Sequence, residues 1–161
     1  MKNNKDILLQ LGHLAFATRL KRISDALMND VSKLYKQHHV NFEARWFTLM
    51  YLLSKQKETS VVDAANSLGL SHVAIIQIIE QLKKNDLIIS HQSKEDARKH
   101  LISLSEKGRN ILNEISPLLK KIEKANKVLT KEVSDDFFKN LSNLEKALKK
   151  KSMFERVNEL K

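Results

Sequence analysis

Residues 71–77 combine side chains that suit contacts with the edges of nucleic-acid bases. Ser71 can cap a helix, because its hydroxyl accepts a free backbone N–H at the helix start. On such a helix Gln77 points outward, and its paired donor and acceptor match adenine in the major groove. Ile76 can touch a thymine methyl group, and His72 can meet a phosphate or a base, although a solvated surface histidine is the alternative. The outward set predicted to contact nucleic acid is Ser71, His72, Val73, Ile76 and Gln77.

Basic side chains accompany this segment further along the chain. Arg98 follows a polar run and suits a narrow, electronegative minor groove. Asp96 is predicted to orient that loop by pairing with Arg98 or with a nearby backbone group, and a plain turn aspartate is the alternative. Lysines can bind phosphates without reading sequence, although a solvated charge cluster would look the same. The candidate phosphate-binding residues are Lys83, Lys84, Lys94 and Lys99.

Two capped helices and a hairpin are expected to position these side chains. Ser60 can cap a helix to Leu68, and Gly69 can end it in the left-handed conformation. The next helix, from Ser71 to about Asn85, turns one apolar face inward. Two strands, 87–91 and 99–104, then flank a polar turn, and Ser105 caps a further helix. This order predicts a winged helix-turn-helix. The inward residues are Ile75, Ile78, Ile79 and Leu82.

Long helices are expected on both sides of this unit. Residues 5–37 carry one apolar stripe and read as a single helix, and Phe42–Ser54 reads as a second. After the hairpin a helix reaches Pro117, which can kink or break it, and a last helix starts near Thr130. The fold class is mostly α with a small β-hairpin wing. We expect one domain, residues 1–161, with a DNA-binding lobe at 42–105 and helical dimerisation regions at 1–41 and 106–161.

Composition sets the outer limits. The chain has 161 residues and no cysteine, which excludes disulfides and thiolate metal sites. Its net charge of +10 suggests a polyanionic partner. Residues 60–105, however, carry five basic and five acidic side chains, so the excess lies on the flanking helices. The apolar runs are too short to span a membrane, and residues 1–10 lack the features of a signal peptide, so a cytoplasmic protein is expected.

The hairpin region resembles the MarR family of bacterial regulators. Asp96-Ala97-Arg98, followed by a strand and then Leu104-Ser105-Glu106-Lys107-Gly108, is similar to that family's wing signature. The chain departs from the pattern in three places: Asp86 replaces a usual glycine, Ser90 replaces a common basic residue, and Ile76 replaces a small polar one. Asn85 is expected to take the left-handed conformation in place of the glycine. Residues 42–47 and Ser71-His72 resemble a subgroup often fused to an acetyltransferase, although a stand-alone regulator is expected here.

The resemblance implies a function and a mechanism. A homodimer would occupy a pseudo-palindromic operator in double-stranded DNA and repress transcription until a small ligand relieves it. In that family the ligand-binding pockets lie between the dimerisation helices and the DNA-binding lobe. Arg45 can meet an anionic ligand there, whereas Phe42 and Trp46 suit packing at least as well. The implied ligand-binding residues are Phe42, Arg45, Trp46 and Met50.

The sequence is also compatible with other classes of function. A protein-interaction module, or a regulatory partner of a separate acetyltransferase, fits the neutral charge of residues 60–105. A metal-sensing regulator would use His38 and His39 with Glu43, or His13 from the first helix. An enzyme is not expected, because the sequence has no Gly-rich phosphate loop, nucleophile elbow or paired carboxylates. No cofactor is expected either.

Overall fold

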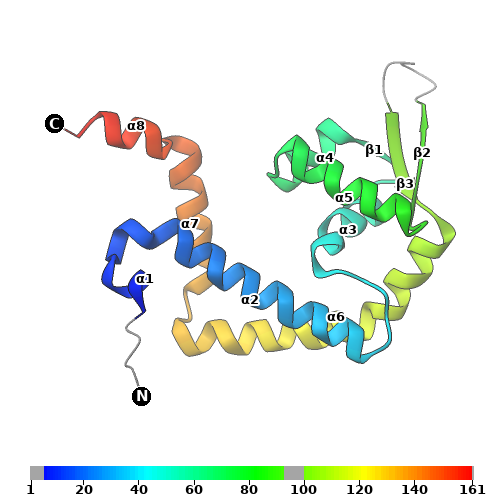
Figure 1. Cartoon of the computed structure of the whole chain (residues 1–161), viewed down its shortest axis with the longest axis horizontal. Helices are drawn as coiled ribbons and strands as arrows, with labels where there is room; N and C mark the ends of the chain where they lie inside the picture. Colours follow the sequence, from blue (N-terminus) through cyan, green and yellow to red (C-terminus); the bar gives the residue numbers. More distant parts are fainter. Residues whose placement is uncertain (1–5, 93–99, 161) are drawn as a thin grey trace. The chain divides into compact units, whose positions relative to one another are not determined.

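The computed structural model describes residues 6–92 and 100–160. The chain divides into two compact units, Met1–Ser116 and Pro117–Lys161, and each is described by itself (Figure 1). This division cuts across the expected lobes, whose functional boundaries stay a prediction. The fold class expected from the sequence is confirmed, since the described residues are mostly helical with one small antiparallel sheet.

The expected single helix over residues 5–37 is wrong, because it is broken near its start. The segment forms α1 (Ile7–Gln10), a 3₁₀ helix (Gly12–Ala15) and α2 (Phe16–Gln37). Gly12 has a φ of 53°, a left-handed conformation that ends α1 and that glycine adopts cheaply. Asp6 caps α1, and its ion pair with Arg22, at 2.7 Å, lowers the pKa of the Asp6 carboxyl.

The second expected helix starts later than predicted. A 3₁₀ turn (Ala44–Trp46) leads into α3 (Phe47–Lys55), while Phe42 lies before the first turn. Tyr35, Phe42 and Trp46 form a chain of edge-to-face ring contacts with centroid distances of 5.1 and 5.7 Å. Burial raises the pKa of the Tyr35 hydroxyl. This aromatic chain ties α2 to the start of α3.

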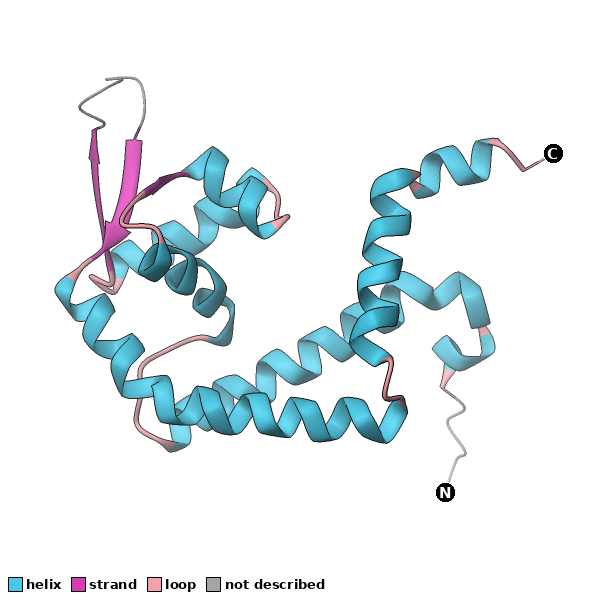
Figure 2. Ribbon diagram, turned by 180° about the vertical axis from the view of Figure 1, so that it is seen from behind, coloured by secondary structure: helices cyan, strands magenta, loops and turns pink. Residues whose placement is uncertain are grey.

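A short strand, two helices and a hairpin follow (Figure 2). They are β1 (Thr59–Ser60), α4 (Val61–Leu68), α5 (His72–Lys84), β2 (Ile88–Gln92) and β3 (His100–Leu104), and the three strands form one sheet. The sheet has the order β1-β3-β2, with both pairs antiparallel. Strand β1 (Thr59–Ser60) was not expected, and it pairs with Ile102 and Leu101 of β3. The hairpin predicted from alternation is confirmed, with Ile88 opposite Leu104 and Gln92 opposite His100.

The core of the first unit lies between these elements. Apolar side chains from α3, α4, α5, the sheet and the helix that follows β3 fill it, and Thr59 is a polar residue buried with them. Removal of these apolar side chains from water is the main favourable contribution to the stability of the unit. Side chains that are almost fully buried include Leu49, Met50, Ile75, Leu82, Leu87, Ile102 and Ile115.

Helix α6 (Glu106–Val133) begins at a tightly connected corner. The Ser105 hydroxyl accepts the backbone N–H of Gly108 at 2.9 Å and donates to the carbonyl of Asp86 at 2.6 Å. Asp86 has a φ of 58°, so the expectation that Asn85 takes the left-handed conformation is wrong. Asn85 is instead the C-cap of α5, and its side-chain amide donates to the Gln81 carbonyl at 2.8 Å. The expected Ser105 cap is confirmed.

We expect the substitution Ser105→Ala to lower the free energy of unfolding by about 1–2 kcal/mol. The change removes both hydroxyl hydrogen bonds at the corner, and loss of an N-cap typically has this effect. Urea unfolding followed by circular dichroism measures it. Ser67→Ala, at an exposed position inside α4, is the control and should cost nothing. Equal unfolding midpoints for Ser105→Ala and the wild type would contradict the assignment of Ser105 as a cap.

The second unit contains the rest of α6, then α7 (Phe137–Lys150) and α8 (Met153–Asn158). Helix α6 continues through Pro117, so the proline does not break it. The last long helix was expected from Thr130 and starts at Phe137, because α6 extends to Val133. Ser152 and Glu155 form a capping box on α8, and these hydrogen bonds lower the pKa of Glu155.

In the part of the chain that the structure describes, no single helix has the length and apolar character needed to cross a bilayer. Helices α4 and α5 meet that criterion only as a pair, and they are bent by 114° at the turn between them.

Candidate nucleic-acid interface

Helices α4 and α5 form the expected helix-turn-helix. The Ser60 hydroxyl accepts the N–H of Asp63 at 3.1 Å, and that of Ser71 accepts the N–H of Ala74 at 3.2 Å, so both predicted caps are confirmed. Gly69 ends α4 with a φ of 63°, also as predicted. Ala65 is buried, which lets the helices approach closely. The bend of 114° between them lies in the range of this motif.

The outward face of α5 carries the residues predicted to read bases. Its inward face is buried as expected, through Ile75, Ile78, Ile79 and Leu82. Val73 is 65% exposed and Ile76 is 43% exposed, so two apolar side chains face solvent beside Gln77. The structure therefore presents the whole predicted set on the surface, and its contact with DNA stays a prediction. The exposed set is Ser71, His72, Val73, Ile76 and Gln77.

The wing stands beside α5, as Figure 1 shows. His91 of β2 pairs with Glu58 at 2.9 Å, which connects the wing to the segment before β1. Exposed lysines at the C-terminal end of α5, Lys83 and Lys84, fit the negative end of the helix dipole. The other predicted DNA contacts lie outside the described residues, and they are Lys94, Asp96, Arg98 and Lys99.

Helix α5, which occupies the position of the recognition helix in a helix-turn-helix, is anchored by a contact that the sequence did not predict. The indole N–H of Trp46 donates to the side-chain oxygen of Gln81 at 2.8 Å, across 35 positions of sequence. A buried indole usually finds such a partner, but the sequence does not tell which one. Gln81 also accepts a hydrogen bond from the Asn85 side chain through its backbone carbonyl, so the C-terminal part of α5 is connected both to the 3₁₀ turn before α3 and to the turn after α5.

The predicted ligand-binding residues separate into two kinds. Phe42, Trp46 and Met50 are buried at 2%, 4% and 0% exposure, and their contacts are those of a packed core. Arg45 is exposed on the turn before α3. Their role toward a ligand stays a prediction.

A cavity of about 380 Å³ lies elsewhere in the first unit, at the other end of α3. Sequence reasoning missed it, because its walls come from three segments far apart in the chain. They are the end of α3 with the turn after it, the end of β3 and the first turns of α6. The lining residues are Leu53, Ser54, Lys57, Leu104, Arg109, Leu112 and Asn113.

The histidines considered for a metal site are not brought together with other ligands. Over residues 6–92 and 100–160, no group of three or more histidine or carboxylate side chains has the geometry to hold a metal ion. His39 has a φ of 58°, so its backbone takes the left-handed conformation in the turn after α2.

Comparison with known proteins agrees with this geometry. A model of the family described as "Transcriptional regulator SarA/Rot" matches residues 31–115, more than half of the chain. This range includes the helix-turn-helix and the wing.

Solved structures of MarR-type regulators share the fold. A MarR/EmrR family regulator from Acinetobacter sp. ADP1 is 23% identical, with 88% of this chain and 96% of that chain covered and a TM-score of 0.67. PcaV from Streptomyces coelicolor, solved with its natural ligand, is 14% identical, with coverage of 89% and 96% and a TM-score of 0.69. MepR from S. aureus, solved with DNA, is 19% identical, with coverage of 84% and 97% and a TM-score of 0.64. The MarR-like winged-helix fold expected from the sequence is thereby confirmed.

Proposed function

The chain belongs to the SarA/Rot family of transcriptional regulators and is a DNA-binding regulator, and from that premise we propose that it represses transcription as a homodimer on a pseudo-palindromic operator. A small ligand relieves the repression. The protein acts in the cytoplasm and without catalytic chemistry of its own.

The observation that carries the DNA-reading part is the exposed face of α5. Its first two turns present Ser71, His72, Val73, Ile76 and Gln77 to solvent, on a helix that is fixed from behind by four buried residues. The first turns of a recognition helix meet the base edges in the major groove. A rigid helix with an uncovered polar and apolar face is suited to that contact.

Exposed apolar faces in both units support the homodimer. In α2 the stripe of Phe16, Leu20, Ile23 and Leu27 is between 42% and 56% exposed. In the second unit, α7 and α8 contain no buried residue, while Phe138, Phe154 and Leu160 are exposed. Exposed apolar patches of this kind mark interaction sites. In a symmetric dimer, the same patches of a second copy of the chain would bury them.

Relief by a ligand is supported by one related structure and by one exposed cation. PcaV, which has the same fold, was solved with its natural ligand. In this chain Arg45 is an exposed guanidinium beside the buried Trp46, and it can meet an anion. The effector role of Phe42, Arg45, Trp46 and Met50 is part of the proposal.

Two measurements on the purified protein test the dimer and its operator together. Sedimentation equilibrium at micromolar concentration should give twice the chain mass. Selection of bound genomic fragments should recover pseudo-palindromes whose half-sites are about 34–36 Å apart, one turn of DNA. A chain that sediments as a monomer and selects single half-sites would refute the homodimer. Phe154→Ser, at an exposed apolar position, should weaken the dimer, whereas Asn140→Ser, at an exposed polar position of α7, should not.

A further inference from the structure

The cavity at the base of the wing has a lining that selects a type of ligand. Its apolar wall consists of Leu53, Leu104 and Leu112, and its two cationic side chains are Lys57 and Arg109. None of the seven lining residues is acidic. A volume of about 380 Å³ falls in the range of small-molecule pockets, which combine apolar walls with a few polar groups.

The two cationic side chains, Arg109 and Lys57, differ in their hydrogen bonding. Arg109 donates from one guanidinium nitrogen to the backbone carbonyl of Leu104 at 2.8 Å, which fixes the position of its charge and leaves further N–H groups for another acceptor. Lys57 forms no hydrogen bond or ion pair within residues 6–92 and 100–160. We propose that this cavity binds a small amphipathic anion, with its carboxylate at Lys57 and Arg109 and its apolar body against the three leucines.

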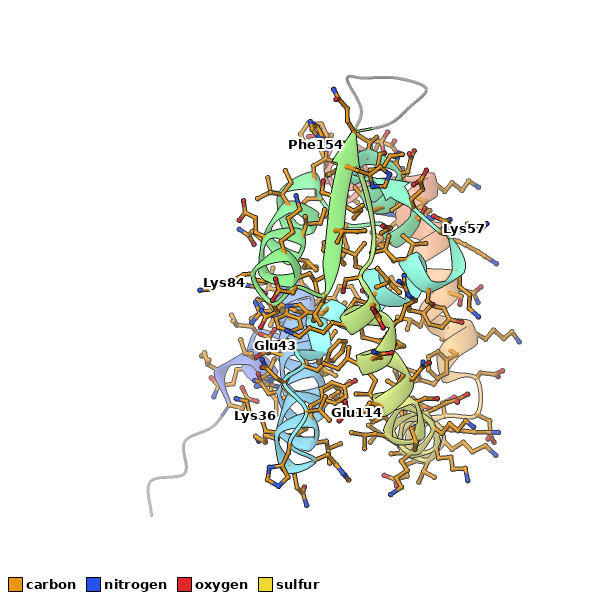
Figure 3. All side chains as sticks on the ribbon, turned by 90° about the vertical axis from the view of Figure 1, so that its right-hand side faces the viewer. Lys36, Glu43, Lys57, Lys84, Glu114 and Phe154 are labelled. Carbon is orange, nitrogen blue, oxygen red and sulfur yellow. The ribbon has the colours of Figure 1, made fainter. Side chains whose placement is uncertain are left out.

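This cavity is distinct from the surroundings of Arg45. Arg45 precedes α3 and Lys57 follows it, and the nine residues of α3 separate them by roughly 14 Å at the usual rise of a helix. Figure 3 shows Lys57 on one flank of the wing, and α5 with its Lys84 on the other. A ligand in the cavity therefore leaves the reading face of α5 uncovered.

The cavity adjoins the segment that holds the wing in place. Lys57 is followed directly by Glu58, which pairs with His91 of β2, and by Thr59, which pairs with Ile102 of β3. Leu104, the last residue of β3, lines the cavity itself. A bound ligand would thus contact both Lys57, next to the residues that hold the wing, and Leu104, where the wing begins. A shift of either residue would change the position of the wing relative to DNA. This coupling rests on the proposed function, because it requires that the wing contributes to DNA binding.

Calorimetric titration with hexanoate and with 1-hexanol tests the site. The two compounds share an alkyl chain, and only hexanoate carries the charge. Hexanoate should bind the full chain with one site per protomer and at least about tenfold more tightly than hexanol, since hydrogen bonds to charged groups contribute roughly that much. The variant K57Q should remove most of this preference. K55Q is the matched control, because Lys55 lies over the Tyr51 ring and does not line the cavity.

Three results would overturn the site: equal affinity for hexanoate and hexanol, a K57Q protein that binds hexanoate as the wild type does, or loss of hexanoate binding in R45A alone. The third would assign the anion to the other end of α3. Since these titrations contain no DNA, they stand or fall independently of the proposed function. With operator DNA added, hexanoate should change the affinity of the wild type and not that of K57Q, and an unchanged wild-type affinity would refute the coupling.

Discussion

The substitution Gly108→Ala is expected to destabilise the protein by about 2 kcal/mol or more, although alanine is the better helix former by about 1 kcal/mol. A Cβ atom at this position would lie 2.1 Å from the carbonyl oxygen of Leu87 and 3.1 Å from its carbonyl carbon. Those are backbone atoms, so no side-chain rotation relieves the clash. The same oxygen accepts the N–H of Ser105 at 3.1 Å. To make room for the Cβ atom, the start of α6 would have to move away from the Leu87 backbone.

Thermal unfolding of Gly108→Ala against Asn110→Ala measures this effect. Asn110 is exposed on the same turn of α6, so its replacement gains helix propensity without a clash. The two variants should therefore move the midpoint in opposite directions. A Gly108→Ala protein as stable as the wild type would mean that α6 does not pack against the Leu87 backbone at this distance.

In DNA binding, the largest loss is expected for Gln77→Ala. Gln77 is exposed on α5 and uncharged, so its loss should cost on the order of 1–3 kcal/mol at one base position of each half-site. Discrimination at that position should relax, and the dependence of affinity on salt should stay unchanged. Fluorescence anisotropy with the selected operator and with scrambled DNA, across a salt series, measures both quantities.

Lys83→Ala is the matched variant on the same helix. Lys83 carries a charge at the C-terminal end of α5, so its loss should weaken operator and scrambled DNA alike and reduce the salt slope by about 0.9 per subunit. The same expectation holds for Arg98→Ala, a position outside the described residues. If Gln77→Ala binds both DNAs like the wild type, α5 does not read bases through this residue.

Features fixed by neighbouring residues were predictable from the sequence. The caps at Ser60, Ser71 and Ser105 and the left-handed Gly69 depend on two or three adjacent positions, and all four are present. The exposed face of α5 followed from the burial of its opposite face, which periodicity alone reveals.

Features that the local pattern hides, several of them fixed by distant partners, were not predictable. Strand β1 has two residues and exists through its pairing with β3, so it has no alternation of its own. Asp86 rather than Asn85 is left-handed, because the Asn85 side chain is engaged with the Gln81 carbonyl. The break at Gly12 was hidden by the apolar stripe that continues past it. The cavity and the Trp46–Gln81 bond both need the tertiary arrangement.

The contact between Trp46 and Gln81 gives the protein an internal optical reporter. Trp46 is the chain's only tryptophan, it is buried, and its N–H is donated to the recognition helix. A buried, hydrogen-bonded indole emits at shorter wavelength than a hydrated one, and its emission responds to the loss of that partner. A displacement of α5 relative to the turn that carries Trp46 should therefore change the emission wavelength and lifetime of a single, identified chromophore. If operator binding moves α5 in this way, we expect the tryptophan emission of the unlabelled protein to report it.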